Sequence, residues 1–207
     1  MDTGADFRTQ VLRANIRKID AAVFTHSHTD HVMGFDDLRR YSAFRGGMPV
    51  YASAETMEDL RRVFKFAFEG LNPFPGYLKP EPHLVDGPFS LGATLLTPLP
   101  VPHGNSEVYG YLFSRSDEKL VAYLSDCSAI PDAIASLIHG VKILIVDALR
   151  QQPHPTHMSV GQALEAASRI KPGQTYFTHI SHELPQAAEA ELPPDTFIAY
   201  DGLKLAL

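Results

Sequence analysis

The chain has 207 residues, enough for one domain with a sizeable core, and its 44% apolar content argues against disorder. Its formal net charge of −6 argues against general affinity for nucleic acid or for an anionic membrane surface. A single cysteine, Cys127, excludes an intrachain disulfide and a zinc site built from several cysteines. From the length we expect one domain over residues 1–207. No signal-peptide pattern and no membrane-length apolar run is visible, so we expect the protein in the cytoplasm.

The first predicted elements surround a cluster of histidines. Residues 20–24 have the apolar run of a short buried strand, which ends at the sequence THSHTDH. The elements expected next are a helix over 34–40, a strand over 49–52, a helix over 53–68 with Ser53 as its N-cap, and a proline-rich loop over 71–82. Such a long loop in a compact domain is often a lid or an interface arm.

The second half of the chain alternates short strands with helices. Strands are predicted over 93–99, 108–113, 119–124, 142–148, 174–180, 196–200 and 203–207, and helices over 131–138 and 159–170. Many short strands, with helices both early and late, favour an α/β (α+β) fold over a simple doubly wound sheet. We expect a two-sheet sandwich with helices on its outer faces.

Several of these strands run directly into a residue that can bind a metal ion. The residues concerned are His26, His28, Asp30, His31, His103, Asp126 and His179. Ligands at strand ends that gather at one edge of a sandwich sit on a rigid scaffold. His26 and His28 alternate, so both can point the same way from an extended segment. Imidazole and carboxylate without thiolate suit zinc, manganese or iron.

The histidine cluster HSHTDH has the form H-x-H-x-D-H, and with His103, Asp126 and His179 it resembles the metallo-β-lactamase-fold metallohydrolases. The resemblance runs from Asp2 to the C-terminus. Within that superfamily, the sequences TPLPVPHGNSEVYGYLF, YLSD, THMS, THISH and AYDGL resemble phosphoribosyl cyclic phosphodiesterases linked to carbon–phosphorus lyase pathways. Those enzymes are distant relatives of ribonuclease Z. The resemblance implies a four-layer αβ/βα sandwich.

The resemblance also implies a cofactor of two divalent metal ions per chain, zinc or manganese. By the family's order, His26, His28 and His103 would hold one ion, Asp30, His31 and His179 the second, and Asp126 would bridge them. Two such ions can share a hydroxide and clamp the attacking and leaving oxygens. The related flavodiiron oxygen reductases carry an acid in place of His28, so this motif favours hydrolysis over redox chemistry.

A second group of residues is predicted to act on the substrate. In the resembled phosphodiesterases a histidine at the position of His157 is catalytic, and we predict that it protonates the leaving oxygen or steadies the phosphoryl group, assisted by Asp30. The alternative is that His157 only helps to start the next helix. His182 and His154 are candidates for binding substrate phosphate, with a supporting or surface role as the alternative. Asp147 either orients a ligand histidine or simply ends its strand.

The N-terminal sequence DTG contains Asp2 and also spells the aspartic-protease signature. A protease needs two paired carboxylates, and the sequence has no second copy, so the pair would require a dimer. No apolar strand precedes DTG either, which argues against a protease. In the resembled fold an aspartate in this context orients the metal loop, which is the role we expect for Asp2. Members of this branch carry opening strands before this point. The chain is therefore expected to be N-terminally truncated, with an exposed sheet edge that favours a homodimer.

We predict a dinuclear metal-dependent phosphodiesterase acting on a small cyclic sugar phosphate, such as 5-phosphoribosyl 1,2-cyclic phosphate, or on a nucleotide-like ester. The expected partner is a small phosphorylated substrate, with no membrane and no long nucleic acid. Three alternatives stay open. They are a ribonuclease Z-like phosphodiesterase, a thioester or lactone hydrolase of the same fold, and a metal-binding remnant without catalysis.

Overall fold

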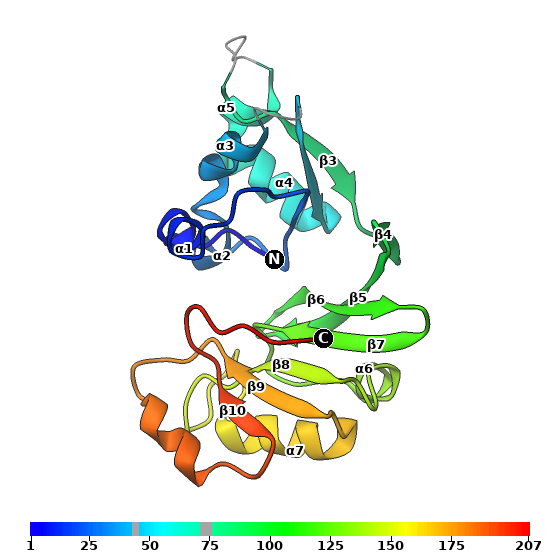
Figure 1. The fold of residues 1–207 in the computed structure, drawn as a ribbon, viewed down its shortest axis with the longest axis vertical. Coiled ribbons are helices and arrows are strands. Elements are labelled where there is room, and N and C mark those ends of the chain that lie inside the picture. The colour runs from blue at the N-terminus through cyan, green and yellow to red at the C-terminus, as the bar shows by residue number, and fades with distance from the viewer. Residues whose placement is uncertain (43–45, 71–75) are drawn as a thin grey trace. The chain divides into compact units, whose positions relative to one another are not determined.

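The computed structural model describes residues 1–42, 46–70 and 76–207. The chain forms two compact units, Met1–Asp86 and Gly87–Leu207, each with its own sheet (Figure 1). Each unit also has its own cluster of buried apolar side chains. The single domain predicted for residues 1–207 stays a prediction, because a compact unit is not by itself an independent domain. Within the described residues, no helix is long and apolar enough to cross a membrane.

The first unit contains a parallel three-stranded sheet in the order β1-β2-β3. Its elements are α1 (Phe7–Arg13), β1 (Ala22–Val23), α2 (Thr29–Val32), η1 (Phe35–Leu38), α3 (Arg39–Ser42), β2 (Met48–Ala52), α4 (Ala54–Val63), α5 (Lys65–Phe68) and β3 (Pro80–Leu84). Phe35 lies at the centre of its core, with ring centroids 5.8 Å from Phe24 and 4.7 Å from Phe64. Burying each such side chain contributes roughly 1.5–3 kcal/mol.

The helix predicted over residues 53–68 begins where expected and is then interrupted. The Ser53 hydroxyl accepts a hydrogen bond from the Thr56 amide at 3.2 Å, so the N-cap is confirmed. Phe64 leaves the helical region at φ −108° and ψ 38°, which divides the segment into α4 and α5. The ring of Phe64 is drawn into the core at this point, and local helix propensity yields to packing.

Two other predictions in this unit differ from the structure. Residues 71–75 of the predicted loop lie outside the described residues, but Pro80–Pro82 belong to β3, so the loop prediction is wrong there. Proline is tolerated because β3 is an edge strand. The helix predicted over 34–40 is a 3₁₀ turn followed by α3. Helix α1 was not predicted, and Phe7 is its only buried residue, which leaves almost no apolar stripe to recognise.

The second unit contains a seven-stranded mixed sheet in the order β10-β9-β8-β7-β6-β5-β4. Its elements are β4 (Phe89–Leu91), β5 (Thr94–His103), β6 (Ser106–Arg115), β7 (Glu118–Leu124), α6 (Asp132–Leu137), β8 (Ile143–Asp147), α7 (Val160–Ile170), β9 (Gln174–Thr178), η2 (Gln186–Glu191) and β10 (Thr196–Ile198). The strand predicted over residues 203–207 is absent, because this alternating segment pairs with no sheet edge.

Strand direction in this sheet brings four chain segments to one edge. β5 and β7 are both antiparallel to β6, so they run the same way, and β8 and β9 are parallel to β7. The C-terminal ends of these four strands therefore meet at one edge of the sheet. The residues at or just after those ends are His103, Asp126, Asp147 and His179.

Candidate functional site

In the first unit, the segment from the end of β1 through α2 carries the histidine cluster, and Asp2 holds it. The Asp2 carboxylate accepts hydrogen bonds from the Thr25 amide at 2.8 Å, the Thr25 hydroxyl at 3.0 Å and His31 Nδ1 at 3.0 Å. Three donors on one carboxylate fix the start of the segment and its far end together. The predicted role of Asp2 in orienting this loop agrees with these contacts.

The hydrogen bonds in this segment also assign the tautomers of two histidines. The Thr25 hydroxyl gives its only proton to Asp2, so at 3.0 Å it accepts the Nδ1 proton of His26. His31 likewise donates from Nδ1 to Asp2. The Nε2 atoms of His26 and His31 therefore carry the lone pair that a metal ion requires.

The three imidazoles of the segment are packed together within this unit. The ring centroid of His26 lies 4.5 Å from that of His28 and 4.2 Å from that of His31. Asp30 Oδ2 lies 3.3 Å from His31 Nε2. Two ligands bound at about 2.0–2.1 Å to a tetrahedral ion are roughly 3.4 Å apart, so this pair fits a shared ion.

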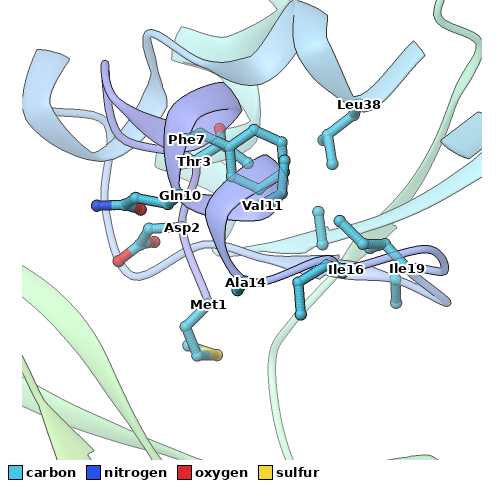
Figure 2. Close-up of a pocket in the computed structure, with 12 residues that line it drawn as sticks. Met1, Asp2, Thr3, Phe7, Gln10, Val11, Ala14, Ile16, Ile19 and Leu38 are labelled. Atoms are coloured by element: carbon cyan, nitrogen blue, oxygen red, sulfur yellow. The ribbon is translucent and has the colours of Figure 1, made fainter. Parts of the chain in front are cut away.

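Figure 2 shows an apolar cavity elsewhere in this unit, with a volume of about 320 Å³. Its lining includes Phe7, Val11, Ile16 and Ile19, and Asp2 is its only acidic or basic side chain. The Asp2 carboxylate already accepts three hydrogen bonds from the histidine segment. The cavity therefore offers no acid, base or ligand set of its own.

In the second unit, the strand-end residues form a cluster around His157. The ring centroid of His157 lies 4.7 Å from that of His103 and 4.7 Å from that of His179, the latter nearly parallel. Asp126 Oδ2 lies 3.3 Å from His179 Nε2 and 4.0 Å from His157 Nδ1. His103, Asp126 and His157 each offer a ligand atom within 4.8 Å of the other two, and so do Asp147, His157 and His179.

Asp147 is fully buried at the end of β8 and holds His157. Its Oδ2 accepts a hydrogen bond from His157 Nδ1 at 2.7 Å and another from the Cys127 amide at 3.0 Å. Burial raises the pKa of Asp147, and the bonds from His157 and from Cys127 oppose that rise. Asp147 therefore supports His157, the predicted catalytic residue, where the sequence suggested a ligand histidine. Cys127 is fully buried, and burial raises the pKa of its thiol.

The segment that carries His157 also fixes His103. The Thr156 carbonyl accepts the Nδ1 proton of His103 at 2.8 Å, so His103 Nε2 carries the lone pair. Gly104 makes the close approach possible, because a Cβ there would lie 2.7 Å from Thr156 Cγ2. Sequence reasoning missed Thr25, Gly104 and Thr156. The glycine directly after His103 was the one available signal, since backbone acceptors have no residue-specific signature.

Helix α7 begins without help from His157. Its N-cap is Ser159, which accepts from the Gln162 amide, while the Gln162 side chain accepts from the Ser159 amide in a capping box. The helix predicted over residues 159–170 is thus confirmed. The alternative role of His157 as a helix starter loses its main support.

The two predicted substrate residues differ in their surroundings. His154 Nδ1 accepts from the Thr156 amide at 3.3 Å, which leaves a proton on Nε2, and its ring centroid lies 5.1 Å from that of His157. Desolvation lowers the pKa of His154, and the neighbouring His157 and Arg150 lower it further. His182 is exposed in the turn after His179, and His179 itself adopts a left-handed φ of 56°.

Comparison with known proteins gives consistent matches over most of the chain. Residues 1–180 match the family described as β-lactamase superfamily domain. A solved diphosphatase of the PhnP family shares 43% identity at a TM-score of 0.88, over 99% of this chain and 77% of that one. Zn²⁺-bound PqqB from Methylobacterium extorquens, at 17% identity, matches in fold with a TM-score of 0.77, over 100% of this chain and 82% of that one.

A curated relative matches over only part of its length. The octanoyltransferase of Porphyromonas gingivalis strain ATCC BAA-308 / W83 is 32% identical over 209 residues. The match covers 99% of this chain and 41% of that protein. The chain thus spans about two fifths of this relative, and the relative's activity as a whole protein does not follow from the match.

Proposed function

Because the chain belongs to the β-lactamase superfamily domain family and is a metallo-β-lactamase-fold hydrolase, we propose that it is a dinuclear metal-dependent phosphodiesterase. The family match and the 43% identical diphosphatase confirm the predicted αβ/βα metallo-β-lactamase fold. The observation that carries the proposal is a shared feature of His26, His31 and His103. Each donates its Nδ1 proton to an oxygen acceptor and so carries a lone pair on Nε2.

This donor set fits divalent metal ions. Neutral imidazoles with carboxylates beside them are the ligands of hydrolytic zinc and manganese sites. The resemblance of the H-x-H-x-D-H motif and of the later His103, Asp126 and His179 to metallo-β-lactamase-fold enzymes supports our assignment of the ligands. By it, His26, His28 and His103 would hold one ion, Asp30, His31 and His179 the second, and Asp126 both. When bound, two such ions lower the pKa of a water molecule and offset negative charge on a phosphoryl group.

The protein's own residues supply the proton that a departing oxygen needs. Asp147 keeps the Nδ1 proton of His157, so a second proton on Nε2 gives an imidazolium that the buried carboxylate stabilises. That Nε2 proton is the one transferred to the leaving oxygen. Asp30 is the proposed assistant. Asp147 thus sets both the orientation of the donor and the ease with which it becomes charged.

The proposed substrate is a small cyclic sugar phosphate such as 5-phosphoribosyl 1,2-cyclic phosphate, and what supports it is the resemblance of several motifs to that phosphodiesterase branch. His154 lies beside His157 with a proton on Nε2, and it is our candidate to donate a hydrogen bond to a phosphate oxygen. His182 remains a second candidate. The net charge of −6 favours a small phosphorylated partner over long nucleic acid.

A second candidate function is hydrolysis of a phosphoric anhydride. The diphosphatase that shares 43% identity favours it. Both reactions attack phosphorus and protonate a leaving oxygen, so the same residues would serve either one. They differ in the leaving group, which is a sugar oxygen in the first reaction and a phosphate in the second.

The test is hydrolysis by metal-stripped protein reconstituted with Mn²⁺ or Zn²⁺. The panel contains 5-phosphoribosyl 1,2-cyclic phosphate, a nucleoside diphosphate, a structured RNA and an acyl thioester, with Asp126→Ala as the control. Metal-dependent turnover of the cyclic phosphate, absent in the variant, supports the first function. Preferred turnover of the anhydride supports the second. Turnover of the thioester alone, or of none of the four, contradicts both. The predicted homodimer stays a separate proposal, for which sedimentation is the measurement.

A further inference from the structure

The ligand pair His26 and His28 is separated by one residue whose side chain leaves the histidine cluster altogether. The Ser27 hydroxyl donates a hydrogen bond of 2.5 Å to Asp59 Oδ2 on helix α4, 32 residues further along the chain. Thr25, the residue before His26, is held by Asp2. The segment is therefore fixed by two carboxylates that come from different parts of the first unit.

Helix α4 is a rigid support for this second attachment. Ser53 caps its first turn, and Met57 and Leu60 on either side of Asp59 are buried in the core of the unit. The side chain of Asp59 is 24% exposed, and its other oxygen is paired with Arg62 one turn further on. Arg62 balances the carboxylate charge, and the buried neighbours restrict where the carboxylate can move.

We propose that Asp59 is a positioning residue that sets the direction of His26 and His28 through Ser27. The bond fixes the backbone between the two imidazoles, whose ring centroids lie 4.5 Å apart, so that the two rings do not have to be ordered when an ion arrives. A charged acceptor gives a stronger bond than a neutral one, and this bond is partly shielded from water. The inference rests on the proposed function, since it requires these histidines to bind an ion.

The test measures Co²⁺ affinity by competition with a chromophoric chelator, together with the visible absorption spectrum of the bound ion. Ser27→Ala and Asp59→Ala are each expected to weaken binding by about tenfold or more and to change the spectrum. The double variant should be no weaker than the worse single variant, because both changes break the same link. Ser27→Thr keeps the hydroxyl and should restore binding to near the wild-type value.

Glu58→Ala is the matched control, because it removes an exposed carboxylate from the adjacent position of the same helix. It should leave affinity and spectrum unchanged. Wild-type binding and spectrum in both single variants, or additive losses in the double variant, would overturn the inference. If Asp59→Ala does not fold, Ser27→Ala decides alone. If the wild-type protein binds no Co²⁺, or binds it equally well after His26→Ala, the proposed function fails together with the inference. If the wild-type protein binds Co²⁺ through His26 but the Ser27 and Asp59 variants bind it normally, only the inference fails.

Discussion

The two units place their candidate residues in opposite ways. In the first unit, four residues lie within six positions of one segment, His26 to His31, and two carboxylates, Asp2 and Asp59, hold the segment in place. In the second unit, the residues come from five segments spread from His103 to His179. They meet because strand direction brings four strand ends to one edge and because the segment before α7 returns to it.

This difference explains where each cluster is vulnerable. The cluster of the first unit depends on a few side-chain hydrogen bonds, since β1 has only two residues and cannot hold the segment by sheet pairing alone. The cluster of the second unit stands on a seven-stranded sheet and needs side-chain support mainly at His157. Changes that break hydrogen bonds should therefore affect metal affinity in the first unit and turnover in the second.

The largest effect is expected from Asp126→Ala. This carboxylate lies within 4.0 Å of both His157 and His179, and removing it takes away the proposed ligand shared by both ions. Turnover of the cyclic phosphate should fall by about 10⁴-fold or more, with loss of bound metal. Steady-state kinetics and elemental analysis of the same preparation measure both. Retained turnover would remove Asp126 from the site.

The next effect is expected from His157→Ala, which removes the proposed proton donor. Turnover should fall by about 10²–10⁴-fold while metal content stays at the wild-type level. His154→Ala, a neighbouring histidine that donates only to substrate in our account, should have a smaller effect. Metal loss in His157→Ala would show that His157 is a ligand and not an acid.

Asp147→Asn sharpens the comparison from the second unit. The neutral amide of Asn is a weaker acceptor than the carboxylate for the hydrogen bonds from His157 and from the Cys127 amide. His157 therefore loses its fixed orientation and the negative charge that stabilises its imidazolium form. Turnover should fall by about 10–100-fold, with metal affinity nearly unchanged. The measurement is the pH profile of turnover alongside chelator competition. If Asp147→Asn instead lowered metal affinity by about 10–100-fold and left turnover unchanged, the expectation that the second unit's hydrogen bonds affect turnover and not affinity would be wrong.

Asp2→Asn is the counterpart in the first unit. An amide accepts fewer of the three bonds from Thr25 and His31, so metal affinity should fall by about 10–100-fold. The folded state should also lose about 1–3 kcal/mol in denaturant unfolding. Asp6→Asn is the control, because it removes an exposed carboxylate from the same N-terminal stretch as Asp2; it should change neither metal affinity nor stability. Unchanged affinity in Asp2→Asn would remove Asp2 from its supporting role.

The smallest effect concerns His154 and pH. The pKa of His154 is lowered by desolvation and by nearby cations, so the folded protein prefers the neutral ring. The stability this provides is present above the ordinary histidine pKa of about 6.5 and is lost as pH falls through the lower folded value. Titration of the metal-free protein by NMR should give a midpoint below 6.5, with the signal assigned by its absence in His154→Gln. A midpoint at or above 6.5 would contradict the assignment of Nδ1 as an acceptor.

The sequence was most informative where chemistry is local. The segment THSHTDH identified its own cluster, and His103, Asp126 and His179 were found because each follows or ends a predicted strand and because the motif set resembles a known family. Most of the hydrogen bonds that hold these site residues in place could not be predicted from the sequence. The Thr156 carbonyl on His103 and the Cys127 amide on Asp147 are backbone contacts, and Asp59 reaches Ser27 across 32 residues. Such pairs depend on tertiary packing, which leaves no periodic pattern.

The central claim is the proposed function, a hydrolase that works with two bound metal ions, and metal content per chain tests it most directly. Wild-type protein, His26→Ala from the first unit and His103→Ala from the second would be loaded with Zn²⁺, desalted and measured by elemental analysis. The account predicts two ions per wild-type chain, and the same ion lost in each variant, with no further loss in the double variant. A wild-type chain without metal, or losses that add in the double variant, would contradict it.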